Sequence, residues 1–96
     1  RRGMNDDPAK TFHVWQVFTF MVRAFIMVKA GTGHAEALAD RLGELDHVTI
    51  ANVVAGNFDV IVEAEAEEVY DIIHSVATRI RGFEDVEDTK TYICLE

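Results

Sequence analysis

From Met21 onward, the spacing of hydrophobic residues changes repeatedly between the periods of strands and helices. Residues 22–30 carry apolar side chains at odd and even positions alike, which predicts a strand covered on both of its faces. Residues 48–54 and 60–64 are short runs rich in valine and isoleucine, and they predict two more strands. A last strand is expected from Val86 to Leu95.

Two other segments place apolar residues on one face of a helix. The first helix is expected over residues 34–45, with an apolar stripe formed by Ala35, Leu38, Leu42 and Leu45. The second is expected over residues 67–81, with a stripe formed by Val69, Ile72, Ile73, Val76 and Ile80. Acidic residues at its start and arginines at its end favour this second helix, and Gly82 is a typical C-terminal stop.

The resulting order, β-α-β-β-α-β, is that of a ferredoxin-like α+β sandwich. We expect a four-stranded antiparallel sheet with two helices on one face. Two helices leave the other face bare, yet the first strand directs Phe25 and Met27 there. A small domain rarely leaves such an apolar patch in water, so we expect a two-fold dimer that buries Phe25 and Met27 in a sheet-to-sheet interface.

Residues 1–20 differ in composition from residues 21–96. Gly3, Asn5 and Pro8 lie among the first ten residues, a composition typical of an irregular segment, whereas Met21 opens a segment that is complete in itself. We expect residues 1–20 to be an N-terminal extension, non-native or disordered, before a single domain of residues 21–96.

Composition and charge exclude several classes of protein. Hydrophobic residues (49%) and charged residues (27%) are balanced as in a folded domain. With 17 acidic residues against 9 basic ones, the net charge of −8 argues against direct binding of nucleic acid. The excess of acid, with arginine more frequent than lysine, fits either a protein of a high-salt cytoplasm or an ordinary acidic domain.

Neither a membrane segment nor a secretory signal is evident. The apolar tract of residues 12–28 is interrupted by His13, Gln16 and Arg23, and it is too short and polar to cross a bilayer. Asp6 and Asp7 lie where a signal peptide has basic residues. We therefore expect a cytoplasmic protein that does not contact membranes.

The residue types that carry catalysis or bind metals lack the necessary spacing. Ser75 and His74 are neighbours on a helix and point about 100° apart, so they do not form a nucleophile and its base. The histidines show no metal-ligand spacing, and the single Cys94 forms no internal disulfide. Gly31-Thr-Gly33 lacks the full glycine fingerprint of a phosphate site, which favours a plain turn. No catalytic residue, metal or cofactor is predicted.

The segment Gly56-Asn-Phe-Asp59 joins the second and third strands. Gly56 and Asn57 are residue types that accept positive φ, and Phe58 can anchor a hairpin turn. The first interpretation of the segment is therefore a hairpin turn with a purely structural role. The same turn would expose backbone donors and acceptors beside the carboxylate of Asp59. Such groups hold the two charged ends of a free amino acid, so a binding site is the second interpretation.

Several segments together resemble the C-terminal effector domain of the Lrp/AsnC family of transcriptional regulators. They are residues 24–29, 54–60, 72–73, 80–81 and 86–93, and the similarity extends roughly over residues 22–95. The G-x-[FY]-D turn at Gly56 to Asp59 and the closing T-x-T strand with Thr89 and Thr91 are the most specific parts. The resemblance implies a sheet-mediated dimer, further assembly into a ring, and binding of free amino acids between subunits near that turn.

The resemblance also implies roles for individual residues. Gly56 and Asn57 would supply backbone contacts to the amino acid, Phe58 would wall the pocket, and Asp59 would receive the ammonium group or orient the loop. Thr89 and Thr91 would add hydroxyl contacts from the neighbouring strand. Regulators of this family carry a helix-turn-helix domain that residues 1–20 cannot supply, and Gly82-Phe83 replaces a Pro-Gly pair that often closes the second helix.

The leading hypothesis is a non-enzymatic module that senses a free amino acid or a similar small effector and oligomerises, alone or with full-length Lrp/AsnC regulators. Two alternatives stay open. One is a purely structural partner of such regulators without a ligand. The other is a small dimeric ferredoxin-like enzyme of the monooxygenase type, although no haem ligand or paired polar constellation is evident.

Overall fold

The computed structural model of the chain describes residues 21–95. Its first half consists of strand β1 (Val22–Ala30), helix α2 (Ala35–Leu42) and strands β2 (Val48–Val53) and β3 (Val60–Ala66). A second helix then runs through α3 (Val69–Asp71), the π-helical segment η1 (Ile72–Ala77) and α4 (Thr78–Arg81), before strand β4 (Val86–Ile93). The predicted β-α-β-β-α-β order is confirmed. The extension expected at residues 1–20 lies outside the described residues.

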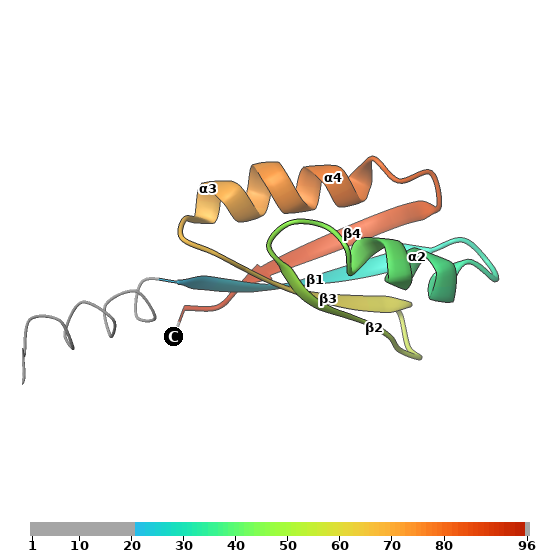
Figure 1. Ribbon diagram of the computed structural model, residues 1–96. Coiled ribbons are helices and arrows are strands. Elements are labelled where there is room, and N and C mark those ends of the chain that lie inside the picture. Colours follow the sequence, from blue (N-terminus) through green and yellow to red (C-terminus); the bar gives the residue numbers. More distant parts are fainter. Residues whose placement is uncertain (1–20, 96) are drawn as a thin grey trace, which may run out of the picture.

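The four strands form one antiparallel sheet in the order β2-β3-β1-β4. Both helices lie on the same side of this sheet (Figure 1). The order places β1 and β3 at the centre and β2 and β4 at the edges. The ferredoxin-like α+β fold predicted from the sequence is therefore confirmed.

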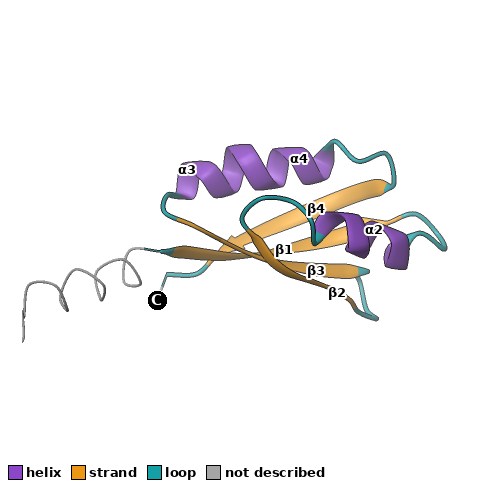
Figure 2. Cartoon of the chain, in the orientation of Figure 1, coloured by secondary structure: helices purple, strands orange, loops and turns teal. Residues whose placement is uncertain are grey.

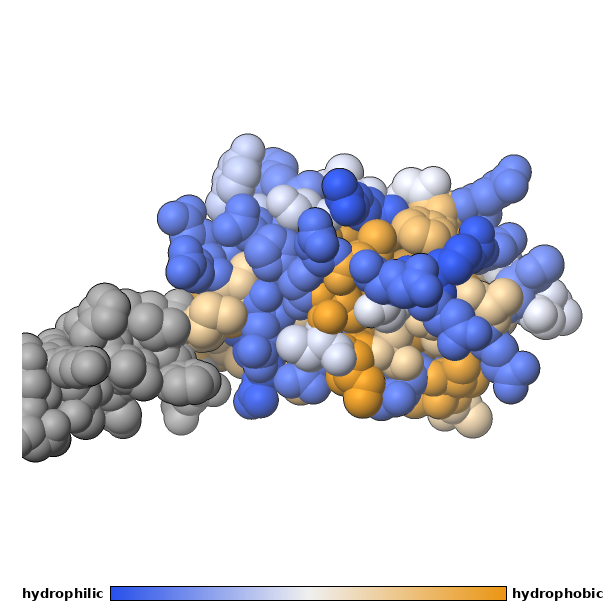
Figure 3. Space-filling view, viewed as in Figure 1, coloured by the Kyte–Doolittle hydropathy of each residue, from blue (hydrophilic) through white to orange (hydrophobic). Residues whose placement is uncertain are grey.

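Alternate residues of the central strands form the core beneath the helices. Ala24, Ile26 and Val28 of β1 are fully buried and pair with residues of β3 that are buried as well. Leu38 and Leu42 of α2 and the stripe Ile72, Val76 and Ile80 of the second helix close the core from above. Seen from the side, as in Figure 1, hydrophobic side chains reach the surface near the middle and at the lower right of the molecule, between hydrophilic ones (Figure 3).

The helices differ from prediction at their ends and in their winding. Helix α2 ends at Leu42 rather than Leu45, which packs on the core from the following turn. The second helix begins at Val69 because Glu68 keeps an extended backbone, with φ −136° and ψ 146°. Of its predicted apolar stripe, Val69 (45%) and Ile73 (36%) are exposed.

The opposite face of the sheet is not covered by a helix. Phe25 and Met27 lie on it half-buried, where Phe25 pairs with Tyr92 of β4 and Met27 with Ile61 of β3. Charged residues share this face, since an Arg23 guanidinium nitrogen lies 3.7 Å from a Glu63 carboxylate oxygen. We call this the open face. Within residues 21–95, no helix is long and apolar enough to cross a bilayer.

Candidate functional site

A tight turn joins β2 to β3 at the residues singled out in the sequence. The N–H of Val54 donates a hydrogen bond of 2.8 Å to the carbonyl of Asp59 and closes this turn. Gly56 has φ +155°, a conformation that its residue type accepts, whereas Asn57 does not adopt a positive φ. Gly56 and Asn57 are exposed, and Phe58 is half-buried.

Asp59 fastens this turn to the end of β1. Its carboxylate oxygen Oδ2 accepts a hydrogen bond of 2.8 Å from the N–H of Ala30, and its own N–H donates to the carbonyl of Val28 at 2.9 Å. The sequence left two roles open for Asp59, and these contacts fit the one in which it orients the loop. The hydrogen bonds of the described residues leave the other oxygen, Oδ1, unused.

An open depression of about 520 Å³ lies beside Asp59. Its lining comes from the end of β1, the following loop, the first turn of α2 and the start of β4: Lys29, Ala30, Gly31, Thr32, Gly33, Ala35, Glu36, Asp59 and Glu87. Figure 2 shows why these segments meet, since the β1–α2 loop, the β2–β3 turn and the α4–β4 loop lie at the same end of the sheet. Its volume is within the range of small-molecule pockets, about 300–1,000 Å³.

The N-terminus of α2 forms one wall of this depression. His34 is its N-cap residue and makes no side-chain capping hydrogen bond. The first N–H groups of a helix have no partner within the helix and carry partial positive charge, so they favour an anion. The sequence predicts a plain turn at Gly31-Thr-Gly33. In the structure, this turn joins β1 to α2, and its residues line part of the depression.

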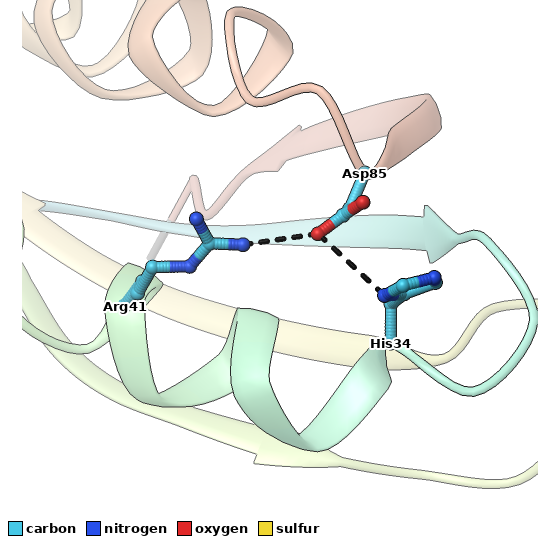
Figure 4. A network of polar contacts seen from close by, with 3 residues as sticks. All are labelled: His34, Arg41 and Asp85. Atoms are coloured by element: carbon cyan, nitrogen blue, oxygen red, sulfur yellow. Dashed lines mark hydrogen bonds and ion pairs between the residues drawn. The ribbon is translucent and has the colours of Figure 1, made fainter.

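Asp85, from the loop before β4, holds α2 in place next to the depression (Figure 4). One of its carboxylate oxygens lies 3.0 Å from an Arg41 guanidinium nitrogen and 3.8 Å from His34 Nδ1. The carbonyl of Asp85 also accepts a hydrogen bond of 3.0 Å from the N–H of Gly31. The loop after β1, the start of α2 and the start of β4 are thereby linked through one residue.

Thr89 and Thr91 lie on β4, with their side chains half-buried on the helix side of the sheet. Thr89 pairs with Val28 and Thr91 with Ile26, and paired residues of antiparallel strands share a face. β4 lies two strand spacings from β3, or about 10 Å. Of the predicted site residues, the structure thus places only Asp59 in the lining of the depression. Gly56, Asn57 and Phe58 belong to the turn that carries Asp59, and they lie outside that lining, as do the two threonines.

Three charged residues of the lining were not predicted as site residues: Lys29, Glu36 and Glu87. Each of the three is a surface residue when its own strand or helix is considered alone. They line a common depression only because β1, α2 and β4 lie next to one another in the fold. One sequence signal was available, because the first helix begins without a capping serine, threonine or aspartate after Gly31-Thr-Gly33. Among residues 21–95, no three His, Cys, Asp or Glu side chains are close enough to hold a metal ion.

Residues 23–96 match the family described as the Lrp/AsnC ligand binding domain. The chain belongs to this family. It is therefore a regulatory ligand-sensing domain of the kind found in transcription regulators, as the turn and the closing strand had indicated. A comparison with curated proteins gives no match.

Solved structures of similar length share the fold. The hypothetical protein PHS023 from Pyrococcus horikoshii is 28% identical with a TM-score of 0.71, over 78% of this chain and 90% of that one. FFRP-DM1 is also 28% identical with a TM-score of 0.71, over 77% of this chain and 99% of that one.

A longer regulator, the NMB0573/L-Met complex from Neisseria meningitidis, has a TM-score of 0.71 at 18% identity, over 84% of this chain. The match covers 54% of the regulator, so this chain spans about half of its length. At this identity, the likeness shows the fold.

Proposed function

We propose that this domain senses a free amino acid in the depression beside Asp59 and assembles through the open face of its sheet. The assembly is a homodimer or a higher ring of this chain, alone or with full-length regulators of the family. The observation that carries the proposal is the pairing of two opposite charges at one depression. A helix N-terminus lies on one wall and the Asp59 carboxylate on another.

An α-amino acid carries the two complementary groups at one carbon atom. Its carboxylate fits the uncapped first turn of α2, where Ala35 and Glu36 line the depression. Its ammonium group fits Oδ1 of Asp59, whose Oδ2 is engaged with Ala30. The structure of a transcriptional regulator in complex with L-Met supports an amino acid as the class of ligand.

The open face supports the assembly. Phe25, Met27 and Ile61 lie together on it, and Tyr92 beside them is 54% exposed. A second copy placed on this face would bury the apolar residues of both copies by one two-fold contact. Arg23 and Glu63 would lie within or beside that contact.

Thermal unfolding with each free amino acid in turn tests the proposed ligand class. A ligand at about 100 times its Kd stabilises the folded state by about 2.7 kcal/mol. We expect at least one amino acid to raise the melting temperature, and its amide, which lacks the carboxylate charge, to do so less. No shift with any amino acid would contradict the proposal and favour the structural partner without a ligand.

Asp59→Asn tests the role of the carboxylate charge. The amide oxygen of asparagine can still accept the hydrogen bond from Ala30, so we expect the fold to be kept. Binding should weaken by about 1.5–3 kcal/mol if the charge meets an ammonium group. Titration calorimetry measures the affinity, and circular dichroism confirms the fold. An unchanged affinity would leave Asp59 with an orienting role alone.

A further inference from the structure

The side chains that line the depression carry a net negative charge. Its lining carries one cationic side chain, Lys29, and three carboxylates: Glu36, Asp59 and Glu87. An amino acid that binds by its α-carboxylate and α-ammonium groups brings no net charge to compensate this excess. The excess of two negative charges therefore remains available to a further cationic group of the ligand.

Each carboxylate has a different local situation. Asp59 is fixed by its bond to Ala30, and Glu36 lies in the first turn of α2, where a negative charge stabilises the helix. Glu87 lies at the start of β4, with a carboxylate oxygen near Gly31 at the mouth of the loop. None of the three forms a salt bridge with a described basic residue.

A metal ion does not fit this excess of charge. A metal needs several ligands within one coordination sphere, and no such group of side chains exists among residues 21–95. A cation on a longer flexible stem can reach a carboxylate at the rim while its other end is held elsewhere. Lysine and arginine side chains have this form.

We propose that the depression selects amino acids with a cationic side chain, lysine or arginine, over neutral and acidic ones. The inference rests on the proposed function, since it assigns the ligand class of the same depression. The α-carboxylate lies at the start of α2, the α-ammonium group at Asp59, and the side-chain cation at the Glu87 side of the rim. The net charge of the protein adds a general attraction for cations that the experiment must separate from this local one.

The test compares four ligands by calorimetry: lysine, norleucine, glutamate and cadaverine. Norleucine is lysine without its side-chain ammonium group, and cadaverine is lysine without its carboxylate. We expect lysine to bind about two- to fivefold more tightly than norleucine, because Glu87 is exposed and an ion pair at an exposed carboxylate contributes about that much. Glutamate should bind most weakly, and cadaverine at least about tenfold more weakly than lysine, since it lacks the carboxylate held by α2.

Variants assign the preference to the depression. Glu87→Gln should weaken lysine binding by about two- to fivefold and leave norleucine binding unchanged. Glu44→Gln removes the same charge from the turn that follows α2, outside the lining, and should change neither affinity. Lys29→Met should strengthen lysine binding, because it removes the single cation of the lining.

The outcomes separate the inference from the proposed function. Equal affinities for lysine and norleucine, or equal losses in Glu87→Gln and Glu44→Gln, would overturn the charge preference while amino-acid sensing stands. Binding of cadaverine as tight as that of lysine would overturn the role of the carboxylate, and with it the amino-acid ligand class. If none of the four ligands binds, the inference is overturned. If no other amino acid binds either, the proposed function is overturned as well.

Discussion

The two faces of the sheet are made from alternate residues of the same strands, and they differ in composition and burial. On the helix side, Ala24, Ile26 and Val28 of β1 are fully buried, and the residues paired with them on β3 are all apolar. On the open face, Phe25 and Met27 are half-buried and lie beside the Arg23–Glu63 ion pair.

The helix side of the sheet stabilises the fold of a single chain, whereas the open face is the proposed contact between chains. A face closed by its own helices can be wholly apolar, because it never meets water in the folded chain. If the open face binds a second copy, as proposed, it must also remain soluble in the free subunit, and charged groups among its apolar residues would serve that need. Neighbouring residues of β1 should therefore respond differently to the same substitution.

The largest effect is expected from Ile26→Asp. Ile26 is fully buried beneath the helices, and an isolated charge placed there costs several kcal/mol, a large part of the stability of a domain, about 5–15 kcal/mol. We expect the chain to be unfolded, as measured by the loss of its far-UV circular dichroism. A folded Ile26→Asp variant would show that the helix side is less tightly closed than the structure indicates.

Phe25→Asp makes the same change one residue earlier, on the open face. We expect the subunit to remain folded and the assembly to dissociate, because the charge would be desolvated in the contact. Light scattering should fall from at least twice the 10.8 kDa chain mass to a single chain mass.

The matched control for Phe25→Asp is Tyr70→Asp, an equally non-conservative change at an aromatic residue that is 64% exposed on the second helix. The control should keep the assembly. If the wild-type protein is a monomer at micromolar concentration, the interface assigned to the open face is wrong.

Gly56→Val tests whether the turn acts independently of both faces. A β-branched residue is strained at φ +155°, at a cost of about 1–3 kcal/mol, and relief of this strain would displace the turn that positions Asp59 at the depression. We expect amino-acid binding to be lost and the assembly to persist. Ala55→Val adds the same side chain to the neighbouring exposed residue and should retain binding. Loss of both binding and assembly in Gly56→Val would mean that the turn takes part in the interface.

The smallest effect concerns salt. Unscreened repulsion among the acidic groups should weaken the assembly in dilute buffer, since the Debye length is about 30 Å at 0.01 M salt and about 3 Å at 1 M. If the net charge of −8 is an adaptation to high salt, the melting temperature should rise between about 0.05 M and about 2 M KCl. A constant melting temperature over this range would indicate an ordinary acidic domain.

The fold was predictable because the periodicity of each element is strong and the elements follow a familiar order. The ends of the helices were less predictable. Leu45 continues the apolar stripe of the first helix, yet it reaches the core from a turn after Leu42. The π-helical segment was missed as well, because Ile72, Val76 and Ile80 are four residues apart and this spacing fits either kind of winding.

The candidate site was predictable only in part. Sequence features mark the turn, since Gly56 and Asp59 are informative residues in one short segment. The rest of the depression depends on contacts across the sheet, such as the bond between Asp59 and Ala30, which are 29 positions apart. The side of β4 that carries Thr89 and Thr91 depends on the register with β1, and the strand itself, with polar and apolar residues mixed, does not determine it.

The order of strands also limits how copies of this chain can meet. β2 and β4 are the edge strands of the sheet. The unpaired backbone groups of an edge strand can pair with strands of further copies and so lead to a fibre. β4 carries Glu87, Asp88 and Lys90, and β2 is only six residues long and irregular between Val48 and Ile50. Charge and irregularity are the means by which natural sheets resist such growth. Pairing of further copies along these edges is thereby discouraged, which is consistent with the proposed closed assembly through the open face.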